Sequence, residues 1–167
     1  MPRNGRPATI VAIMVDRMLR DRFAGALRQL LSRQITNWEF EDFTRGEDLQ
    51  SADRVLGPIY WRAWTLYSDG MWPERVSQST AREMRLDVAR WVLFLQADLE
   101  YRWPPGPMDT FAIRNWPMNL LTFGWWERRK ERELRAWQRH GNFDVWPFWS
   151  RAEFDAARRA PRFLVGV

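Results

Sequence analysis

The sequence has no cysteine and only one histidine, His140. The lack of cysteine excludes disulfide bonds and thiolate zinc sites. There is also no serine-histidine-aspartate order, no glycine-rich phosphate loop and no HExxH metal motif. We expect His140 at a helix C-terminus, where the helix dipole favours a protonated ring, and we interpret it as a surface cap. The sequence predicts no bound cofactor and, apart from the carboxylates described below, no metal site.

Long apolar runs are also missing, and none approaches the roughly 20 residues that a membrane-spanning helix needs. Arg3 and Arg6 precede the apolar residues 8–15 in the manner of a signal peptide. However, the charged residues Asp16 and Arg17 follow, and no small-residue cleavage pattern is near them, so we do not interpret this segment as a signal peptide. We expect a cytoplasmic protein with no membrane partner.

Lysine is nearly absent, since Lys130 is the only lysine among 26 basic residues. We attribute this bias to codon usage in a GC-rich genome, although arginine also suits phosphate and carboxylate groups and stacks on aromatic rings. The formal net charge of +5 is unevenly spread, because residues 1–34 and 111–141 are basic and residues 35–57 are acidic. We expect these segments to attract each other within the fold, with an external partner as the alternative.

The chain is rich in tryptophan, with 12 residues, and its hydrophobic content of 46% argues against disorder. Its most apolar long segment is residues 80–98, which Thr80 and Glu83 open with the spacing of a capping box. Apolar residues then recur with the helical period at Met84, Val88, Trp91, Val92 and Leu95. Three others widen this face, namely Leu86, Leu93 and Phe94. A helix that is apolar over most of its circumference is usually buried, so we expect this one at the centre of the fold.

Five further helices are predicted from apolar periodicity and from end signals. They cover residues 16–32 (or from residue 8), 37–44, 52–68, 118–140 and 150–159. Capping boxes are expected at Thr36 with Glu39 and at Ser150 with Glu153. The segment between residues 101 and 117 is too rich in proline for a helix, so we interpret it as an ordered connector.

In the helix predicted over 52–68, two tryptophans flank the apolar face. Ser51 or Asp53 can cap this helix, and Pro58 either kinks it or begins it. Trp61 and Trp64 lie at the borders of its apolar side. Tryptophan is enriched at the centres of protein interfaces, so we name these two as candidate binding residues.

The dipeptide Trp-Pro occurs four times, at Trp72, Trp103, Trp116 and Trp146. The unequal spacing excludes a repeat architecture. The proline fixes the backbone and the indole supplies apolar area, so each pair is expected to pin a loop to the core. The alternative is an aromatic platform for a sugar or another ligand.

Residues 27–42 read LRQLLSRQITNWEFED. This segment resembles the short helical hairpin called SHOCT, whose pattern is a leucine helix, a turn and then I-T-x-x-E-F. The family usually has a glycine in the turn, where Arg33 and Gln34 stand here, and it tends to lie at C-termini. The resemblance implies a structural or association hairpin, and it carries no catalytic residues.

The predicted helix 118–140 carries four arginines at spacings of i, i+4, i+7 and i+11. They are Arg128, Arg132, Arg135 and Arg139. This stripe lies along one side of the helix and would suit a row of phosphates. The alternative is a solvated face with local ion pairs, since Glu131 can reach Arg135 and Arg129 can reach Glu133.

Carboxylates are the remaining candidates for a catalytic or metal-binding site. Glu39 and Asp42 lie on the short helix 37–44, whereas Asp98 and Glu100 lie at the end of the central helix. If they met across a cleft, they would suit a hard cation or acid-base catalysis. The alternative is that Asp98 and Glu100 pair with arginines and that the short helix has a solvated acidic face.

The sequence therefore predicts an all-α fold, a single domain over residues 1–167 with a flexible start at 1–7. About six helices pack around residues 80–98, and loops rich in tryptophan and proline connect them. We expect a non-enzymatic protein-binding module of a bacterial-type cytoplasmic protein, with an immunity or antitoxin role as one concrete form. The basic charge argues against neutralising a basic nuclease toxin.

Two other functions stay open, namely a nucleic-acid-binding protein and a carboxylate-based metal protein or hydrolase. The oligomeric state is also left open.

Overall fold

The computed structural model describes residues 15–45, 53–67, 72–106 and 125–161, and all regular structure within these residues is helical. The α-helices are α1 (Arg17–Leu31), α2 (Asn37–Arg45), α4 (Leu56–Ala63), α5 (Gln78–Glu83), α6 (Arg85–Gln96), α8 (Trp125–Gln138) and α9 (Arg151–Arg159). Short 3-10 turns follow at η1 (Trp64–Leu66) and η3 (Phe143–Val145). The predicted all-α fold around residues 80–98 is confirmed.

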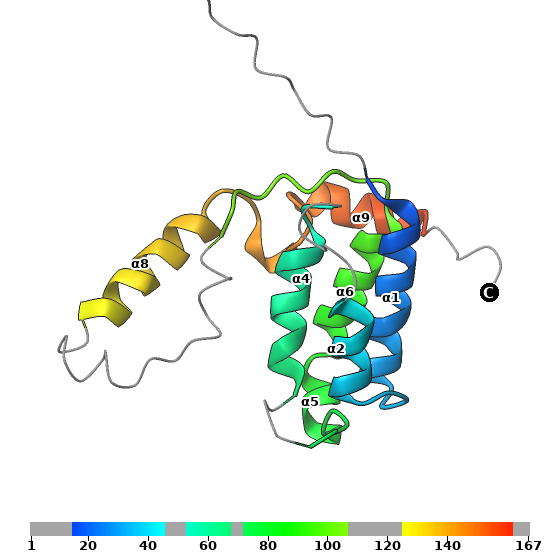
Figure 1. Cartoon of the computed structure of the whole chain (residues 1–167). Coiled ribbons are helices and arrows are strands. Elements are labelled where there is room, and N and C mark those ends of the chain that lie inside the picture. Colours follow the sequence, from blue (N-terminus) through cyan, green and yellow to red (C-terminus); the bar gives the residue numbers. More distant parts are fainter. Residues whose placement is uncertain (1–14, 46–52, 68–71, 107–124, 162–167) are drawn as a thin grey trace, which may run out of the picture.

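Helix α6 lies at the centre of the bundle (Figure 1). Helix α1 runs along it, α2 and α4 lie beside them, and α9 crosses near the C-terminal end of α6 (Figure 1). The core side chains come from α1, α2, α4 and α6 and are almost fully buried: Phe23, Leu27, Leu30, Phe40, Leu56, Ile59, Val88, Trp91 and Leu95. Helix α8 extends away from the bundle (Figure 1).

Helix α1 begins at the later of the two predicted starts. The Asp16 carboxylate accepts a hydrogen bond from the Leu19 backbone at 3.0 Å, which satisfies one of the free N–H groups of the first turn. The question of helix or strand at residues 8–14 falls outside the described residues, as does the predicted flexible start at 1–7.

Helix α1 ends in a Schellman motif. The Gln34 N–H donates to the Gln29 carbonyl at 2.9 Å, and the Arg33 N–H donates to the Leu30 carbonyl at 3.1 Å. This turn places Arg33 in the left-handed region, with φ of 62°. Glycine is the usual residue there, because a Cβ atom is strained in that conformation. The Arg33 Nε is also buried without a hydrogen-bond partner.

Helix α2 follows with the capping box predicted for it. The Thr36 N–H donates to the Glu39 carboxylate at 2.8 Å, and the Glu39 N–H donates to the Thr36 hydroxyl at 3.3 Å. Phe40 is fully buried against Phe23 of α1, with ring centroids 5.9 Å apart. Residues 27–42 thus form a packed helical hairpin.

The central segment differs from its prediction in its cap, its continuity and one exposed residue. Ser77, which is in an extended conformation, caps α5 by accepting from the Thr80 N–H at 3.1 Å, so Thr80 is inside the helix. Met84 adopts φ −87° and ψ 0°, which separates α5 from α6. Leu86 is 81% exposed, because the helical period puts it on the side of α6 away from the buried residues Val88 and Leu95.

The segment predicted as one helix over 52–68 is shorter. Helix α4 starts at Leu56, so Pro58 lies in the first turn, where its missing N–H costs little. The predicted cap Asp53 does not cap α4, because Val55 is at the N-cap position and Asp53 pairs with another residue. Ser51 is outside the described residues. After Ala63 the chain tightens into η1.

Asp53 forms a buried ion pair with Arg20 of α1, and both side chains are at most 2% exposed. The Arg20 Nε donates to one carboxylate oxygen at 2.5 Å and the Nη2 atom donates to the other at 3.0 Å. The remaining Nη1 donates to the carbonyls of Ala97 at 3.1 Å and Leu99 at 2.9 Å. One guanidinium therefore joins α1 to the chain before α4 and to the chain after α6.

Within the core, a group of aromatic side chains surrounds Trp103, which is fully buried. Its indole N–H donates to the Phe148 carbonyl at 3.1 Å, and its ring contacts Trp137 and Trp149 with centroids 4.7 and 5.6 Å away. Trp146 is buried beside Trp91, with centroids 6.2 Å apart. These contacts fix the chain around residues 143–149 to the end of the bundle.

The four Trp-Pro dipeptides therefore differ in their surroundings. The expected pinning of a loop to the core occurs at Trp103 and Trp146. It does not occur at Trp72, because this loop residue is 72% exposed and does not pack against the core. Trp116 lies outside the described residues.

Helices α8 and α9 agree with their predicted positions. The part of the predicted helix over 118–124 lies outside the described residues, and α8 ends at Gln138, before the Gly141 stop signal. Helix α8 is held at its end by Trp137, whose indole N–H donates to the Pro104 carbonyl at 2.9 Å. Helix α9 has the predicted cap, with the Glu153 N–H donating to the Ser150 hydroxyl at 3.3 Å.

We predict that Asp53→Ala lowers the free energy of unfolding by about 3–5 kcal/mol, because it leaves the buried Arg20 charge without its partner. Urea unfolding of the purified variant measures this loss. The control is Asp155→Ala, which removes a carboxylate that is 44% exposed and pairs with Arg151 on the surface. It should cost about 0.5 kcal/mol or less. Equal losses in the two variants would contradict a buried ion pair.

We predict that Arg33→Gly raises the free energy of unfolding by about 0.5–1 kcal/mol, because glycine removes the strain of the left-handed turn. The same urea experiment applies. Gln34→Gly is the matched control, since Gln34 does not share the positive φ and should gain nothing. A lower free energy of unfolding in Arg33→Gly would contradict this prediction. It would show that the arginine side chain stabilises the fold by more than the backbone strain at Arg33 destabilises it.

Candidate functional site

The four predicted arginines are all exposed: Arg128, Arg132 and Arg135 on α8, and Arg139 in the turn after it. Both expected local ion pairs are present, with Arg135 2.5 Å from Glu131 and Arg129 2.9 Å from Glu133. The side of α8 that carries the stripe is therefore open to solvent but partly neutralised.

The structure brings the two predicted tryptophans together. The rings of Trp61 and Trp64 lie 5.2 Å apart between centroids, and Tyr60 contacts both at 5.6 and 6.1 Å. Both indoles are half-buried, and the Trp64 Nε1 is buried without a hydrogen-bond partner. The two indoles and Tyr60 therefore form one aromatic cluster, with a partial surface left for a partner.

Other indoles are more exposed than these. Trp38 is 45% exposed and Trp72 is 72% exposed. Their segments are linked, because the Asn37 N–H donates to the Glu74 carbonyl at 2.8 Å and the Glu74 N–H donates to the Asn37 amide at 2.7 Å. No ring contact joins the two indoles within the described residues, so they do not form one platform.

The candidate carboxylates lie at opposite ends of α1. Glu39 caps α2 just after α1 ends, whereas Asp98 forms an ion pair with Arg17 in the first turn of α1. Since α1 has 15 residues, the two ends are about 22 Å apart. Asp42 and Glu100 are exposed near these same two positions. The four carboxylates therefore do not share a cleft.

Glu39 is also committed to its cap. Hydrogen bonds from the Thr36 backbone N–H and hydroxyl hold the pKa of Glu39 below its ordinary value. A general acid needs a raised pKa, so this carboxyl is tuned in the opposite direction. Among the described residues, no group of three histidine, aspartate or glutamate side chains is placed to hold a metal ion.

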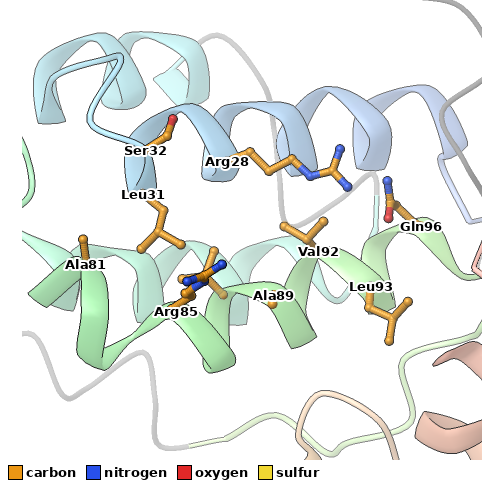
Figure 2. Close-up of a pocket in the computed structure, with 10 residues that line it drawn as sticks. Arg28, Leu31, Ser32, Ala81, Arg85, Ala89, Val92, Leu93 and Gln96 are labelled. Carbon is orange, nitrogen blue, oxygen red and sulfur yellow. The ribbon is translucent and has the colours of Figure 1, made fainter.

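A groove with a volume of about 670 Å³ lies between α1 and the α5–α6 pair. Figure 2 shows α1 on one side and α5 and α6 on the other, with Leu31 pointing from α1 toward the α5–α6 side and Val92 pointing from α6 toward α1 farther along the groove. The lining residues are Arg28, Leu31, Ser32, Ala81, Arg85, Val88, Ala89, Val92, Leu93 and Gln96. We call this hollow the α1/α6 groove.

The α1/α6 groove has an apolar floor and a polar rim. Val88 and Val92 are buried at its base, whereas Arg28, Ser32 and Arg85 are exposed at its edges. The rim lies open to solvent along the length of α6, whose 12 residues span about 18 Å. Such a groove is the shape that receives an amphipathic helix.

A smaller hollow of about 300 Å³ adjoins the α1/α6 groove and shares Leu93 and Gln96 with it. Its walls come from the chain after α6 and from the alanines of α9, namely Ala97, Leu99, Ala156, Ala157 and Ala160. The two hollows together follow one side of α6 from its start to its end.

The sequence contains one signal for this surface that we did not assign to a site. Leu86, Ala89 and Leu93 are spaced i, i+3 and i+7, so they lie on one side of α6. Leu86 and Ala89 are exposed, and Leu93 is half-buried. The most apolar helix of the chain therefore has more apolar surface than the described fold covers. The position of the groove itself depends on how α1 packs on α6, which no local pattern gives.

Comparison of the chain with protein-family models, with curated proteins and with solved structures found no match. The likeness of residues 27–42 to the SHOCT hairpin therefore rests on the residues quoted for it. In the described part of the chain, no helix has the length and apolar character needed to cross a membrane.

Proposed function

We propose that this chain is a non-enzymatic protein-binding module that holds a helical segment of another protein in the α1/α6 groove. The observation that carries the proposal is the apolar floor of that groove beside exposed Leu86 and Ala89. Exposed apolar surface on a helix costs free energy unless a partner covers it.

The shape of the groove supports a macromolecular partner. It is open along its rim and continues into the smaller hollow beside α9, so it has the length of several helical turns. A partner helix could place apolar residues at i, i+4 and i+7 on the floor formed by Leu31, Val88 and Val92. An immunity or antitoxin role in a bacterial-type cytoplasmic protein is one concrete form of this function.

We predict that Ala89→Trp abolishes capture of the partner, because an indole at this exposed lining position fills the groove without burying new side chains in the core. The measurement is affinity capture from the native cell extract with the full chain as bait. Mass spectrometry then compares the variant with the unchanged chain.

The matched control is Ala152→Trp, since Ala152 is exposed in the first turn of α9 and lines neither hollow. It should retain every partner that the unchanged chain captures. Partners captured equally by Ala89→Trp would place their binding site elsewhere and would reject the groove as the functional surface.

A second candidate function is nucleic-acid binding by α8. The observation that favours it is the extension of α8 from the bundle with four exposed arginines. The ion pairs of Glu131 and Glu133 weaken its positive field. Each phosphate that an arginine neutralises releases counterions, so affinity of this kind falls steeply with salt.

For this second function, binding of a fluorescent duplex or single-stranded oligonucleotide should fall by about tenfold or more between 50 and 200 mM salt. Replacing Arg128 and Arg132 by alanine should reduce the dependence on salt, because fewer phosphates are then neutralised. Absence of binding at 50 mM salt would reject nucleic acid as the partner.

A further inference from the structure

Two arginines stand on opposite walls of the α1/α6 groove without an acidic partner. Arg28 comes from α1 and Arg85 from the first turn of α6, and Figure 2 shows both side chains beside the apolar floor. Both are exposed, and neither forms an ion pair with a described residue. Their charges are therefore available to a partner in the groove.

Several arginines elsewhere in the described bundle are paired with carboxylates. Arg17 and Arg20 pair with Asp98 and Asp53, and both donate to carbonyls after α6. On α6 and in the connector, the pairs are Arg90 with Asp87 and Arg102 with Glu153. Arg28 and Arg85 have no such carboxylate, so the rim of the groove carries two positive charges that no described acidic side chain pairs with.

We propose that the α1/α6 groove recognises an acidic amphipathic helix, in which carboxylates flank the apolar stripe on both sides. This inference rests on the proposed protein-binding function and names the chemistry of the partner. A helix lying on Leu31, Val88 and Val92 has one edge toward α1 and the other toward α6. A carboxylate on each edge then meets Arg28 on one wall and Arg85 on the other.

The charges vary along the groove. Figure 2 shows the Arg28 side chain extending toward Gln96, whereas Arg85 lies toward the start of α6. The acidic residues of the adjoining hollow, Asp98 and Glu153, are paired with Arg17 and Arg102. The partner's carboxylates are therefore needed at these two positions along the groove, while its end beyond Gln96 meets the small side chains of α9. A basic helix is disfavoured, because like charges at the rim repel it.

The test uses three synthetic helical peptides that share one length and one apolar stripe but differ at the flanking positions. One carries glutamate there, one glutamine and one lysine. Fluorescence anisotropy with the full chain measures their affinity in 50 mM and 500 mM salt. The glutamate peptide should bind at least about tenfold tighter than the glutamine peptide, and salt should reduce this advantage. The lysine peptide should bind most weakly.

The double variant Arg28→Glu with Arg85→Glu should reverse the order of the glutamate and lysine peptides. Both positions are exposed, so its circular dichroism spectrum and urea midpoint should match those of the unchanged chain. The matched control is Arg128→Glu with Arg132→Glu on α8, which makes the same charge change outside the groove and should keep the original order.

Equal affinity of the three peptides, or no binding by any of them, would overturn the proposed charge preference. A second result would also overturn it: Ala89→Trp abolishes capture of the natural partner, but the double charge reversal at Arg28 and Arg85 leaves capture unchanged. In that case the protein-binding function would stand. If Ala89→Trp itself has no effect on capture, the function assigned to the groove fails as well. The two failures are therefore distinguishable.

Discussion

The buried contact between Arg20 and Asp53 is the constraint on which the arrangement of the bundle depends. A charge taken out of water is costly unless its donors and acceptors are satisfied. Here the guanidinium makes two hydrogen bonds to the carboxylate and two to the backbone carbonyls of Ala97 and Leu99. These bonds fix the position of α1 relative to the chain before α4 and the chain after α6. Arg17 adds a bond to the Leu95 carbonyl in the last turn of α6 and a second donor to the Ala97 carbonyl.

The position of α1 creates the α1/α6 groove. Near the N-terminal end of α1, Arg20 holds the helix against the chain after α6. Toward its C-terminal end, Arg28, Leu31 and Ser32 form one wall of the groove, opposite α5 and the start of α6. The break at Met84 lets α5 contribute Ala81 to the wall opposite α1. A groove built on fixed helices is pre-organised, and this lowers the ordering cost of binding a partner.

The sequence predicts local features well, because their determinants lie within a few residues. The capping box at Thr36 with Glu39 is present with both of its hydrogen bonds. Ser150 caps α9 as predicted, but the Glu153 carboxylate accepts from the Trp149 N–H instead of from the Ser150 N–H. The cap at Thr80 was wrong, because Ser77 adopts the extended conformation that a cap requires. Arg20 and Asp53 are 33 residues apart, and no local pattern distinguishes them from solvated charges. The groove could not be predicted for the same reason, although the exposed Leu86 belongs to a helix that the sequence marks as unusually apolar.

The buried ion pair can be tested most directly by measuring hydrogen exchange of the Arg20 Nε proton by nuclear magnetic resonance. This proton is donated to Asp53 at 2.5 Å inside the core, so it should exchange only when the whole protein unfolds. Its exchange should then depend on denaturant as strongly as that of the slowest backbone amides in α1 and α6. Exchange as fast as that of the exposed Arg28 and Arg85 would show that Arg20 is solvated, and the position of α1 would need another explanation.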